Sequence, residues 1–193
     1  MRIISGINKG IKLFESFDKN TRPLKDLVKE SIFNILEHSK DNKIIFNNSK
    51  VLDLFSGTGS FGLEFISRGA SKVYFVENYK PSIEILNKNI NKLKCKNKIS
   101  VFEDDVNNFA NINQITKNKF DIIFIDPPYK EKNIGLIIEK IIITKILNKN
   151  GRIILHRHKK SIDKLDNKFL LKRTENYGIS KIIFGKIIWL IFS

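Results

Sequence analysis

From residue 51 onward, short apolar runs alternate with longer segments in which apolar residues recur every three or four positions. The short runs are typical of buried strands, and the longer segments are typical of amphipathic helices. Alternation of the two favours parallel strands joined by crossover helices. We expect strands at residues 50–55, 72–76, 99–102, 120–125 and 152–155, and helices at residues 60–68, 81–94, 104–110 and 134–147.

The first forty residues follow a different pattern. Residues 2–5 and 11–14 flank a turn that contains two glycines, which predicts a short β-hairpin. Apolar residues at helical spacing then predict a helix over residues 24–38, which Pro23 would introduce. We expect residues 1–40 to pack as an extension on the main sheet.

The alternation changes again after Gly151. Residues 169–175 and 181–192, joined through a turn that contains Gly178, resemble a closing antiparallel pair. The whole pattern predicts a single domain over residues 1–193 in the α/β class. Its sheet should be doubly wound and Rossmann-like, mostly parallel, with one antiparallel strand near the C-terminus. Such sheets bind ligands at the carboxyl ends of their strands.

Composition narrows the class of partner. A formal net charge of +15 favours a polyanion such as nucleic acid. Lysine carries most of the excess in a chain that is also rich in isoleucine and asparagine, so the composition of an AT-rich genome is an alternative explanation. The single cysteine, Cys95, excludes a disulfide framework. We expect a cytoplasmic protein without membrane contact, and a monomer because no apolar stripe is left over after the core is assigned.

A glycine-rich turn follows the first strand of the alternating region. Residues 51–62 read Val-Leu-Asp-Leu-Phe-Ser-Gly-Thr-Gly-Ser-Phe-Gly, which is a strand running into G-x-G-x-x-G and then into a helix. Glycines let a ligand approach the backbone closely. Glu77 stands twenty residues after Gly57, at the end of the next strand, where a carboxylate can accept hydrogen bonds from ribose hydroxyls. The turn therefore predicts a ligand that contains a nucleoside.

Asp53 helps to choose among such ligands. Nicotinamide and flavin dinucleotides use the same fingerprint, but a carboxylate four residues before the first glycine would repel a pyrophosphate. S-adenosylmethionine has no phosphate and carries a cationic amino-acid end, so Asp53 favours this methyl donor over a purely structural carboxylate. Asp104 and Asp105 follow the third strand at the same edge. We expect Asp105 to accept a hydrogen bond from the adenine amine of the ligand. For Asp104 the alternative is the role of an ordinary helix cap.

The strand at residues 120–125 ends in Asp126-Pro127-Pro128-Tyr129. The two prolines fix the backbone and donate no hydrogen bond, so the nearby carbonyls are free to accept from a ligand. The Asp126 side chain and the Pro127 carbonyl can accept the hydrogens of a base amine, and Tyr129 can stack on an extruded base. A simple Pro-Pro turn is the alternative. The position of the tetrapeptide after a glycine turn, at the end of the fourth strand, favours a catalytic site over a simple turn.

The three histidines carry no comparable signal. His38, His156 and His158 share no spacing with carboxylates or cysteine that would form a metal site, and we expect each to be structural or solvated. A catalytic histidine is also not required, because a sulfonium already activates the methyl group. Positioning of donor and amine supplies most of the rate enhancement in such a reaction.

Together these residues resemble class I methyltransferases, and more narrowly the bacterial family that methylates the exocyclic N2 amine of a guanine in small-subunit ribosomal RNA. The resemblance covers nearly the whole chain. Its narrowest part is amino-terminal, in Arg2-Ile3-Ile4-Ser5-Gly6, Lys9-Gly10 and Thr21-Arg22-Pro23. Its broader part comprises the glycine turn, Val76-Glu77-Asn78 and the Asp-Pro-Pro-Tyr tetrapeptide.

The resemblance implies methyl transfer from S-adenosylmethionine to 16S ribosomal RNA, presented by the small subunit or by its assembly intermediate. It also implies that Arg22 contacts the RNA or braces the closing loop, with Tyr129 as a second substrate contact. The catalytic residues would be Asp126, Pro127, Pro128 and Tyr129. The donor-binding residues would be Asp53, Phe55, Ser56, Gly57, Thr58, Gly59, Glu77, Asn78, Asp105 and Val106.

Three other functions remain open from the sequence. The same chemistry could serve another amine, such as adenine N6 in DNA or RNA or a protein glutamine amide, because each offers a planar conjugated nitrogen. The glycine turn also fits a dinucleotide-dependent oxidoreductase. The third function is that of a non-catalytic RNA-binding assembly factor.

Overall fold

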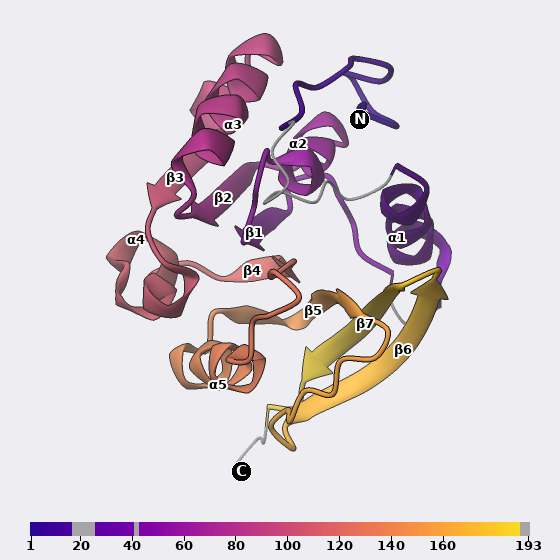
Figure 1. Cartoon of the computed structure of the whole chain (residues 1–193), viewed down its shortest axis with the longest axis vertical. Helices are drawn as coiled ribbons and strands as arrows, with labels where there is room; N and C mark the ends of the chain where they lie inside the picture. Colours follow the sequence, from indigo (N-terminus) through magenta and orange to yellow (C-terminus); the bar gives the residue numbers. More distant parts are fainter. Residues whose placement is uncertain (17–25, 41–42, 190–193) are drawn as a thin grey trace.

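The computed structural model describes residues 1–16, 26–40 and 43–189. Within these ranges a sheet of seven strands lies at the centre, in the order β3-β2-β1-β4-β5-β7-β6 (Figure 1). Among the described strands, β7 runs antiparallel to both β5 and β6, and the other neighbouring pairs are parallel, which confirms the expected α/β sheet. The bounds are β1 Lys50–Leu54, β2 Lys72–Glu77, β3 Ile99–Glu103, β4 Phe120–Ile125, β5 Leu147–His158, β6 Phe169–Tyr177 and β7 Ser180–Ile187.

Every strand predicted from an apolar run in the alternating region is present. The bounds of β1, β2 and β3 agree with the prediction to within one residue, and those of β4 are the same. β5 is longer than expected, because it already pairs at Leu147 with Phe120 before the register shifts to Arg152 with Ile122. The polar residues 148–151 interrupt the apolar run there, so periodicity reveals only the second half of this strand.

Three of the four predicted crossover helices are confirmed as α2 Ser60–Ser67, α3 Lys80–Lys92 and α5 Ile134–Thr144. The helix predicted over residues 104–110 is wrong. The chain there forms a 3-10 helix, η2 Val106–Asn111, followed by the single turn of α4 Asn113–Thr116. The side chains of Asn107 and Asn108 donate to the carboxylates of Asp105 and Asp104. Local side-chain bonds of this kind compete with a regular α-helix.

The predicted amino-terminal hairpin is reduced to one antiparallel bridge, between Arg2 and Lys12. The amides of Ile4 and Ser5 donate to the carboxylate of Glu64 on α2, over 2.8 and 2.9 Å, and not to an opposing strand. A side chain from the main domain therefore ends the ladder. This contact could not be read from the local pattern.

Helix α1 spans Asp26–His38 and agrees with the second half of the amino-terminal prediction. The first two positions of that predicted helix, together with Arg22 and Pro23, lie outside the described residues. Buried side chains of α1 include Val28, Ile32 and Phe33, which join the same apolar cluster as α2 and α3.

Two apolar clusters cover the two faces of the sheet. One contains side chains of α1, α2 and α3, and the other contains side chains of α4 and α5 (Figure 1). The pleat of β1 sends Val51 into the first cluster and Leu52 into the second. Phe61 of α2 stacks on Phe124 of β4, with 3.7 Å between ring centroids. This stack places the start of α2 against the strand that carries the Asp-Pro-Pro-Tyr tetrapeptide.

Strands β6 and β7 form the predicted closing pair, joined by a turn in which Gly178 adopts a φ of +60°. β7 ends at Ile187, and residues 190–192 of the predicted strand lie outside the described residues. In the part of the chain that the structure describes, no helix is both long enough and apolar enough to cross a membrane.

Candidate functional site

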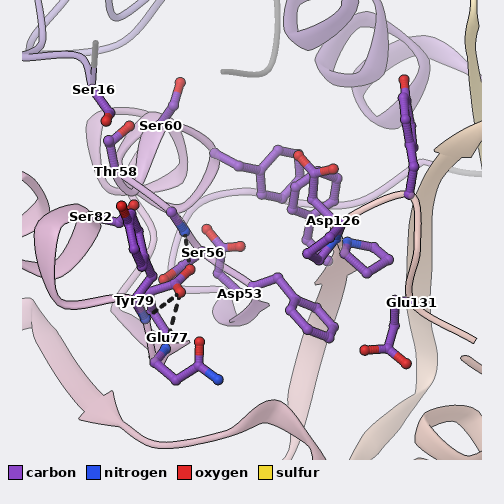
Figure 2. Close-up of a pocket in the computed structure, with 18 of the residues that line it drawn as sticks. Ser16, Asp53, Ser56, Thr58, Ser60, Glu77, Tyr79, Ser82, Asp126 and Glu131 are labelled. Carbon is purple, nitrogen blue, oxygen red and sulfur yellow. Dashed lines mark hydrogen bonds between the residues drawn. The ribbon is translucent and has the colours of Figure 1, made fainter. Parts of the chain in front are cut away.

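A cavity of about 700 Å³ opens at the carboxyl ends of β1, β2 and β4 (Figure 2). The glycine turn lines one part of it and the Asp-Pro-Pro-Tyr tetrapeptide lines another, so two motifs distant in sequence face one space. The predicted site residues that line the cavity are Asp53, Phe55, Ser56, Gly57, Thr58, Glu77, Asn78, Asp105, Asp126, Pro127, Pro128 and Tyr129.

Three predicted site residues are not among the described residues that line the cavity. Gly59 caps the start of α2 and does not line the cavity. Val106 is 2% exposed and packs into the apolar cluster that contains α4 and α5. Arg22 lies outside the described residues, so its predicted contact with substrate remains a prediction.

The glycine turn needs its glycines for two different physical reasons. Gly57 and Gly59 have φ values of +54° and +81°, in the left-handed region that residues with a Cβ rarely adopt. Gly62 instead permits close packing, because a Cβ there would lie 2.4 Å from the Phe75 ring of β2. No atom lies within 4 Å of a Cβ built at Gly57, so the turn presents open backbone to the cavity.

Asp53 is the most deeply buried carboxyl in the cavity wall, at 1% exposure. Its Oδ2 accepts a hydrogen bond of 3.0 Å from the Gly62 amide, while Oδ1 has no hydrogen-bond partner among the described residues. Burial raises the pKa of Asp53 well above its usual range, and the nearby Asp126 and Glu77 carboxylates raise it further. A cation placed against Oδ1 would reverse this effect, because an opposite charge favours the ionised carboxylate.

Glu77 joins the end of β2 to the glycine turn. Its Oε2 accepts from the Gly57 amide over 2.7 Å, and its Oε1 accepts from the amides of Asn78 and Tyr79 over 3.0 and 2.9 Å. Dashed lines mark these bonds in Figure 2. The sequence predicted a ribose contact for Glu77 and missed this structural role. The two are compatible, because an ionised carboxylate offers about four acceptor positions.

Asp105 begins η2 as its N-cap. One carboxyl oxygen accepts from the Asn107 amide over 2.7 Å and from Asn107 Nδ2 over 2.9 Å. The other oxygen lies 3.5 Å from Nδ2 of Asn78. The capping role considered for Asp104 thus belongs to its neighbour. Asp105 lines the cavity, and its proposed contact with adenine would involve the less occupied oxygen.

Two buried hydroxyls extend the polar wall. Ser56 Oγ in the glycine turn and Ser82 Oγ in the first turn of α3 both line the cavity, and neither has a hydrogen-bond partner among the described residues. Buried polar atoms are almost always paired in folded proteins, so these two atoms indicate a polar ligand. Ser82 could not be found from the sequence, because only the helical fold of residues 80–92 brings it to the cavity.

The opposite wall is formed by the loop after β4. The Asp126 amide donates to the Leu54 carbonyl over 3.2 Å, which continues the pairing between β4 and β1 into the loop. Asp126 Oδ1 lies 2.8 Å from Nδ1 of His156, a residue of β5 that is 2% exposed. From the sequence, His156 was expected to be structural or solvated. It is buried, and its ring contacts the carboxylate that was assigned to catalysis.

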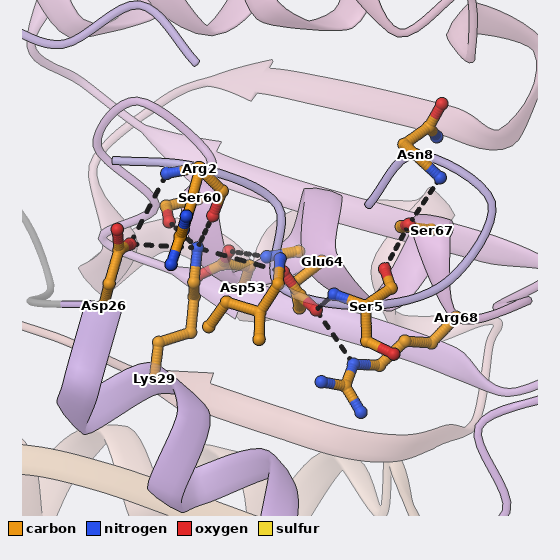
Figure 3. Close-up of polar contacts among 12 residues, drawn as sticks. Arg2, Ser5, Asn8, Asp26, Lys29, Asp53, Ser60, Glu64, Ser67 and Arg68 are labelled. Carbon is orange, nitrogen blue, oxygen red and sulfur yellow. Dashed lines mark hydrogen bonds and ion pairs between the residues drawn. The ribbon is translucent and has the colours of Figure 1, made fainter. Parts of the chain in front are cut away.

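A buried ionic cluster ties the amino-terminal segment to the cavity wall (Figure 3). Lys29 of α1 donates to the Ser60 hydroxyl over 3.0 Å and to the Arg2 carbonyl over 2.7 Å. Its Nζ lies 3.9 Å from Glu64, which also pairs with Arg68 over 2.9 Å. Burial lowers the pKa of Lys29 against the opposing effect of Glu64. Because Ser60 lines the cavity, the cluster connects α1 and the amino-terminal segment to the start of α2.

Known proteins resemble this chain over most of its length. Residues 1–186 match the family described as Conserved hypothetical protein 95. YlbH of Bacillus subtilis, provisionally named an rRNA methyltransferase, is 30% identical over 187 residues, which cover 96% of this chain and 98% of that protein. Ribosomal RNA small subunit methyltransferase D of Buchnera aphidicola subsp. Acyrthosiphon pisum is 35% identical over 159 residues, which cover 82% and 78%.

A solved structure extends the likeness to the fold. A Haemophilus influenzae protein, provisionally described as a methylase, superposes with a TM-score of 0.76 at 29% sequence identity. The superposition covers 97% of this chain and 98% of that one. The order of the described strands, the glycine turn and the antiparallel placement of β7 therefore form a class I methyltransferase fold.

Proposed function

We propose, from the premise that the chain belongs to the Conserved hypothetical protein 95 family, that it is an S-adenosylmethionine-dependent methyltransferase acting on ribosomal RNA. The acceptor that we propose is the exocyclic N2 amine of a guanine in 16S ribosomal RNA. One observation carries the proposal. The glycine turn and the Asp-Pro-Pro-Tyr loop line the same cavity, so a donor held by the first would face an amine held by the second.

The donor-binding wall fits S-adenosylmethionine better than a dinucleotide. Asp53, Glu77 and Asp105 line the cavity, and a wall of carboxylates repels a pyrophosphate. Oδ1 of Asp53, which none of the described residues binds, suits the cationic amino group of the methyl donor. Glu77 would accept from the ribose and Asp105 from the adenine amine. When bound, S-adenosylmethionine supplies a methyl group already activated on a sulfonium.

The acceptor wall fits a planar amine. Asp126 and the Pro127 carbonyl would accept the two hydrogens of the amine, which frees the nitrogen lone pair for attack as the nitrogen becomes tetrahedral. Tyr129 would stack on the extruded base, a contact that contributes about 1–3 kcal/mol in comparable sites. Extrusion is required because the target atom of a paired base lies inside the stack.

The substrate would be presented by the small ribosomal subunit or its assembly intermediate, with Arg22 as an additional RNA contact. The chain would act as a cytoplasmic monomer, with residues 1–40 as an extension of a single domain. Its formal net charge of +15 supports binding to a polyanion of this kind.

The proposal is tested by transfer of a labelled methyl group to purified small subunits that lack the modification, followed by digestion to nucleosides. We expect the label in N2-methylguanosine. Label in N6-methyladenosine, or in methylglutamine of a ribosomal protein, would assign the same chemistry to another acceptor. Asp126→Ala should abolish transfer, whereas Glu103→Ala, an exposed acidic residue outside the cavity lining, serves as the matched control.

A further inference from the structure

Three consecutive residues at the end of β5 hold the loop that follows β4. His156 Nδ1 lies 2.8 Å from Asp126 Oδ1. The ring of His158 lies edge-on to Tyr129, with 5.0 Å between centroids. Arg157 alternates with them along the strand and contacts the backbone of the same loop. The two side chains proposed to meet the base are therefore each contacted from β5.

Arg157 fixes the backbone of the loop. Its guanidinium donates to the carbonyl of Glu131 over 2.8 Å and to that of Pro128 over 3.4 Å. Its Nη2 and Nε also bind the two oxygens of Asp163, over 2.9 and 3.1 Å, and the Arg157 side chain is 4% exposed. A buried bidentate pair of this kind restrains the guanidinium. The loop carbonyls thus have a rigid donor.

The sheet register explains why His156 meets Asp126. Ile125 of β4 and Leu155 of β5 are partners in the parallel register. The residues that follow them, Asp126 and His156, therefore lie side by side. β4 ends at this point, but β5 continues and pairs His156 with Ile182 of β7. Asp126 therefore stands on a loop, while its histidine partner stands inside the sheet. The strand is the more rigid of the two supports.

We infer that His156 is a positioning residue for the methyl transfer, because its ring nitrogen holds Asp126 Oδ1 and so directs Oδ2 toward the hydrogen of the target amine. The inference rests on the proposed function. We assign Nδ1 as the donor and Asp126 Oδ1 as the acceptor of this hydrogen bond. His156 touches neither donor nor base in this scheme, and it acts only through Asp126.

In the transfer step, Asp126 Oδ2 receives the proton that the amine loses. The nitrogen lone pair forms the N–C bond, the C–S bond breaks, and its electron pair stays on sulfur. The nitrogen then releases one proton to Asp126 Oδ2, from which it passes to solvent. Loss of the His156 contact leaves the methyl donor and the amine in place but frees the Asp126 carboxylate to rotate. We therefore expect a lower kcat with little change in KM.

The test compares three variants in the transfer assay. His156→Asn keeps an N–H close to the position of Nδ1, His156→Gln moves it one bond further from the backbone, and His156→Leu removes it. We expect His156→Leu to lower kcat by roughly 10- to 100-fold, as misplacement of a reacting group does in other enzymes. KM for RNA and for S-adenosylmethionine should change little. His156→Asn should lie closer to the wild type than either of the other two.

Each outcome has one meaning. Equal kcat values for His156→Asn and His156→Gln, or full activity of a folded His156→Leu, would overturn the inference while the proposed function stands. A wild-type protein that methylates no RNA overturns the proposed function, and the inference with it. If His156→Leu does not fold, the comparison of Asn with Gln decides alone. His38→Asn, on the exposed side of α1, controls for the loss of a histidine.

Discussion

Glu77 Oε2 accepts a hydrogen bond of 2.7 Å from the Gly57 amide, which joins the end of β2 to the middle of the glycine turn. The same carboxylate also accepts from the amides of Asn78 and Tyr79. The Gly57 bond holds the turn in the conformation that opens toward the cavity, and the other two bonds fix the carboxylate to the segment that follows β2. A residue predicted only to meet the ribose thus also shapes the surface on which the nucleoside would lie.

Glu77→Gln tests this double role. A glutamine keeps the size of the side chain, but its amide nitrogen cannot accept from a backbone N–H. We expect affinity for S-adenosylmethionine to fall at least tenfold, equivalent to about 1.4 kcal/mol, because a buried donor loses its partner and the ribose loses a charged acceptor. Isothermal titration calorimetry measures the change. Glu84→Gln on the exposed face of α3 is the control, and equal losses in both variants would argue against a specific role.

Asp53→Asn should change how stability depends on pH in the absence of donor. Burial raises the pKa of Asp53 well above 3.8. Above pH 3.8 the unfolded chain loses this proton while the folded protein keeps it, so the free energy of unfolding falls as pH rises toward the folded pKa. An asparagine removes this contribution. We expect the stability of Asp53→Asn relative to the wild type to increase with pH over this window.

Urea denaturation at a series of pH values measures that difference. A constant difference between the two proteins would show that Asp53 does not titrate differently in the folded and unfolded states. The same variant should bind S-adenosylmethionine more weakly, since the cationic amino group loses its carboxylate partner. Unchanged binding would count against the assignment of that group to Asp53.

Lys29→Met should destabilise the fold strongly. Lys29 is fully buried, and its removal leaves the Ser60 hydroxyl and the Arg2 carbonyl without a donor and Glu64 with one fewer cation. Breaking a buried pair typically costs about 3–5 kcal/mol. Chemical denaturation gives the value, and Lys88→Met on the exposed face of α3 is the matched control. A loss no larger than that of the control would mean that the cluster does not stabilise the amino-terminal segment.

Two glycine substitutions should separate packing from ligand binding. In Gly62→Ala the new Cβ would lie 2.4 Å from the Phe75 ring, so we expect a loss of about 1–3 kcal/mol in stability. Gly57→Ala meets no atom within 4 Å but keeps a φ of +54°, so the strain falls on the turn that faces the cavity. Its main effect should be weaker donor binding. Thermal unfolding measures the loss of stability, and calorimetry measures the loss of donor affinity. A larger loss of stability in Gly57→Ala than in Gly62→Ala, with weaker donor binding only in Gly62→Ala, would contradict this assignment of roles.

The local pattern was sufficient for the elements that depend on neighbours in sequence. The β1 run, the glycine turn and α2 were all predictable, because apolar periodicity and glycine spacing are local signals. The segment after β3 was not, since Asp105 and the following asparagines form side-chain bonds that replace the predicted helix. Periodicity contains no information about such competition.

The site was predictable in its motifs but not in its support. The topology of a doubly wound sheet brings the ends of β1, β2 and β4 to one edge, so the convergence of Asp53, Glu77 and Asp126 could be expected. The contact of His156 with Asp126 depends on the register between β4 and β5. A histidine in an apolar run gives no sign of that register, and the three-residue support from β5 was therefore missed.

A crystal structure with S-adenosylhomocysteine bound would show whether the donor lies between the glycine turn and the Asp-Pro-Pro-Tyr loop. We expect the amino-acid end of the ligand against Asp53 Oδ1, its ribose at Glu77, and its sulfur facing Asp126 across the cavity. A ligand bound outside this cavity, or one whose sulfur points away from the Asp-Pro-Pro-Tyr loop, would contradict this expectation.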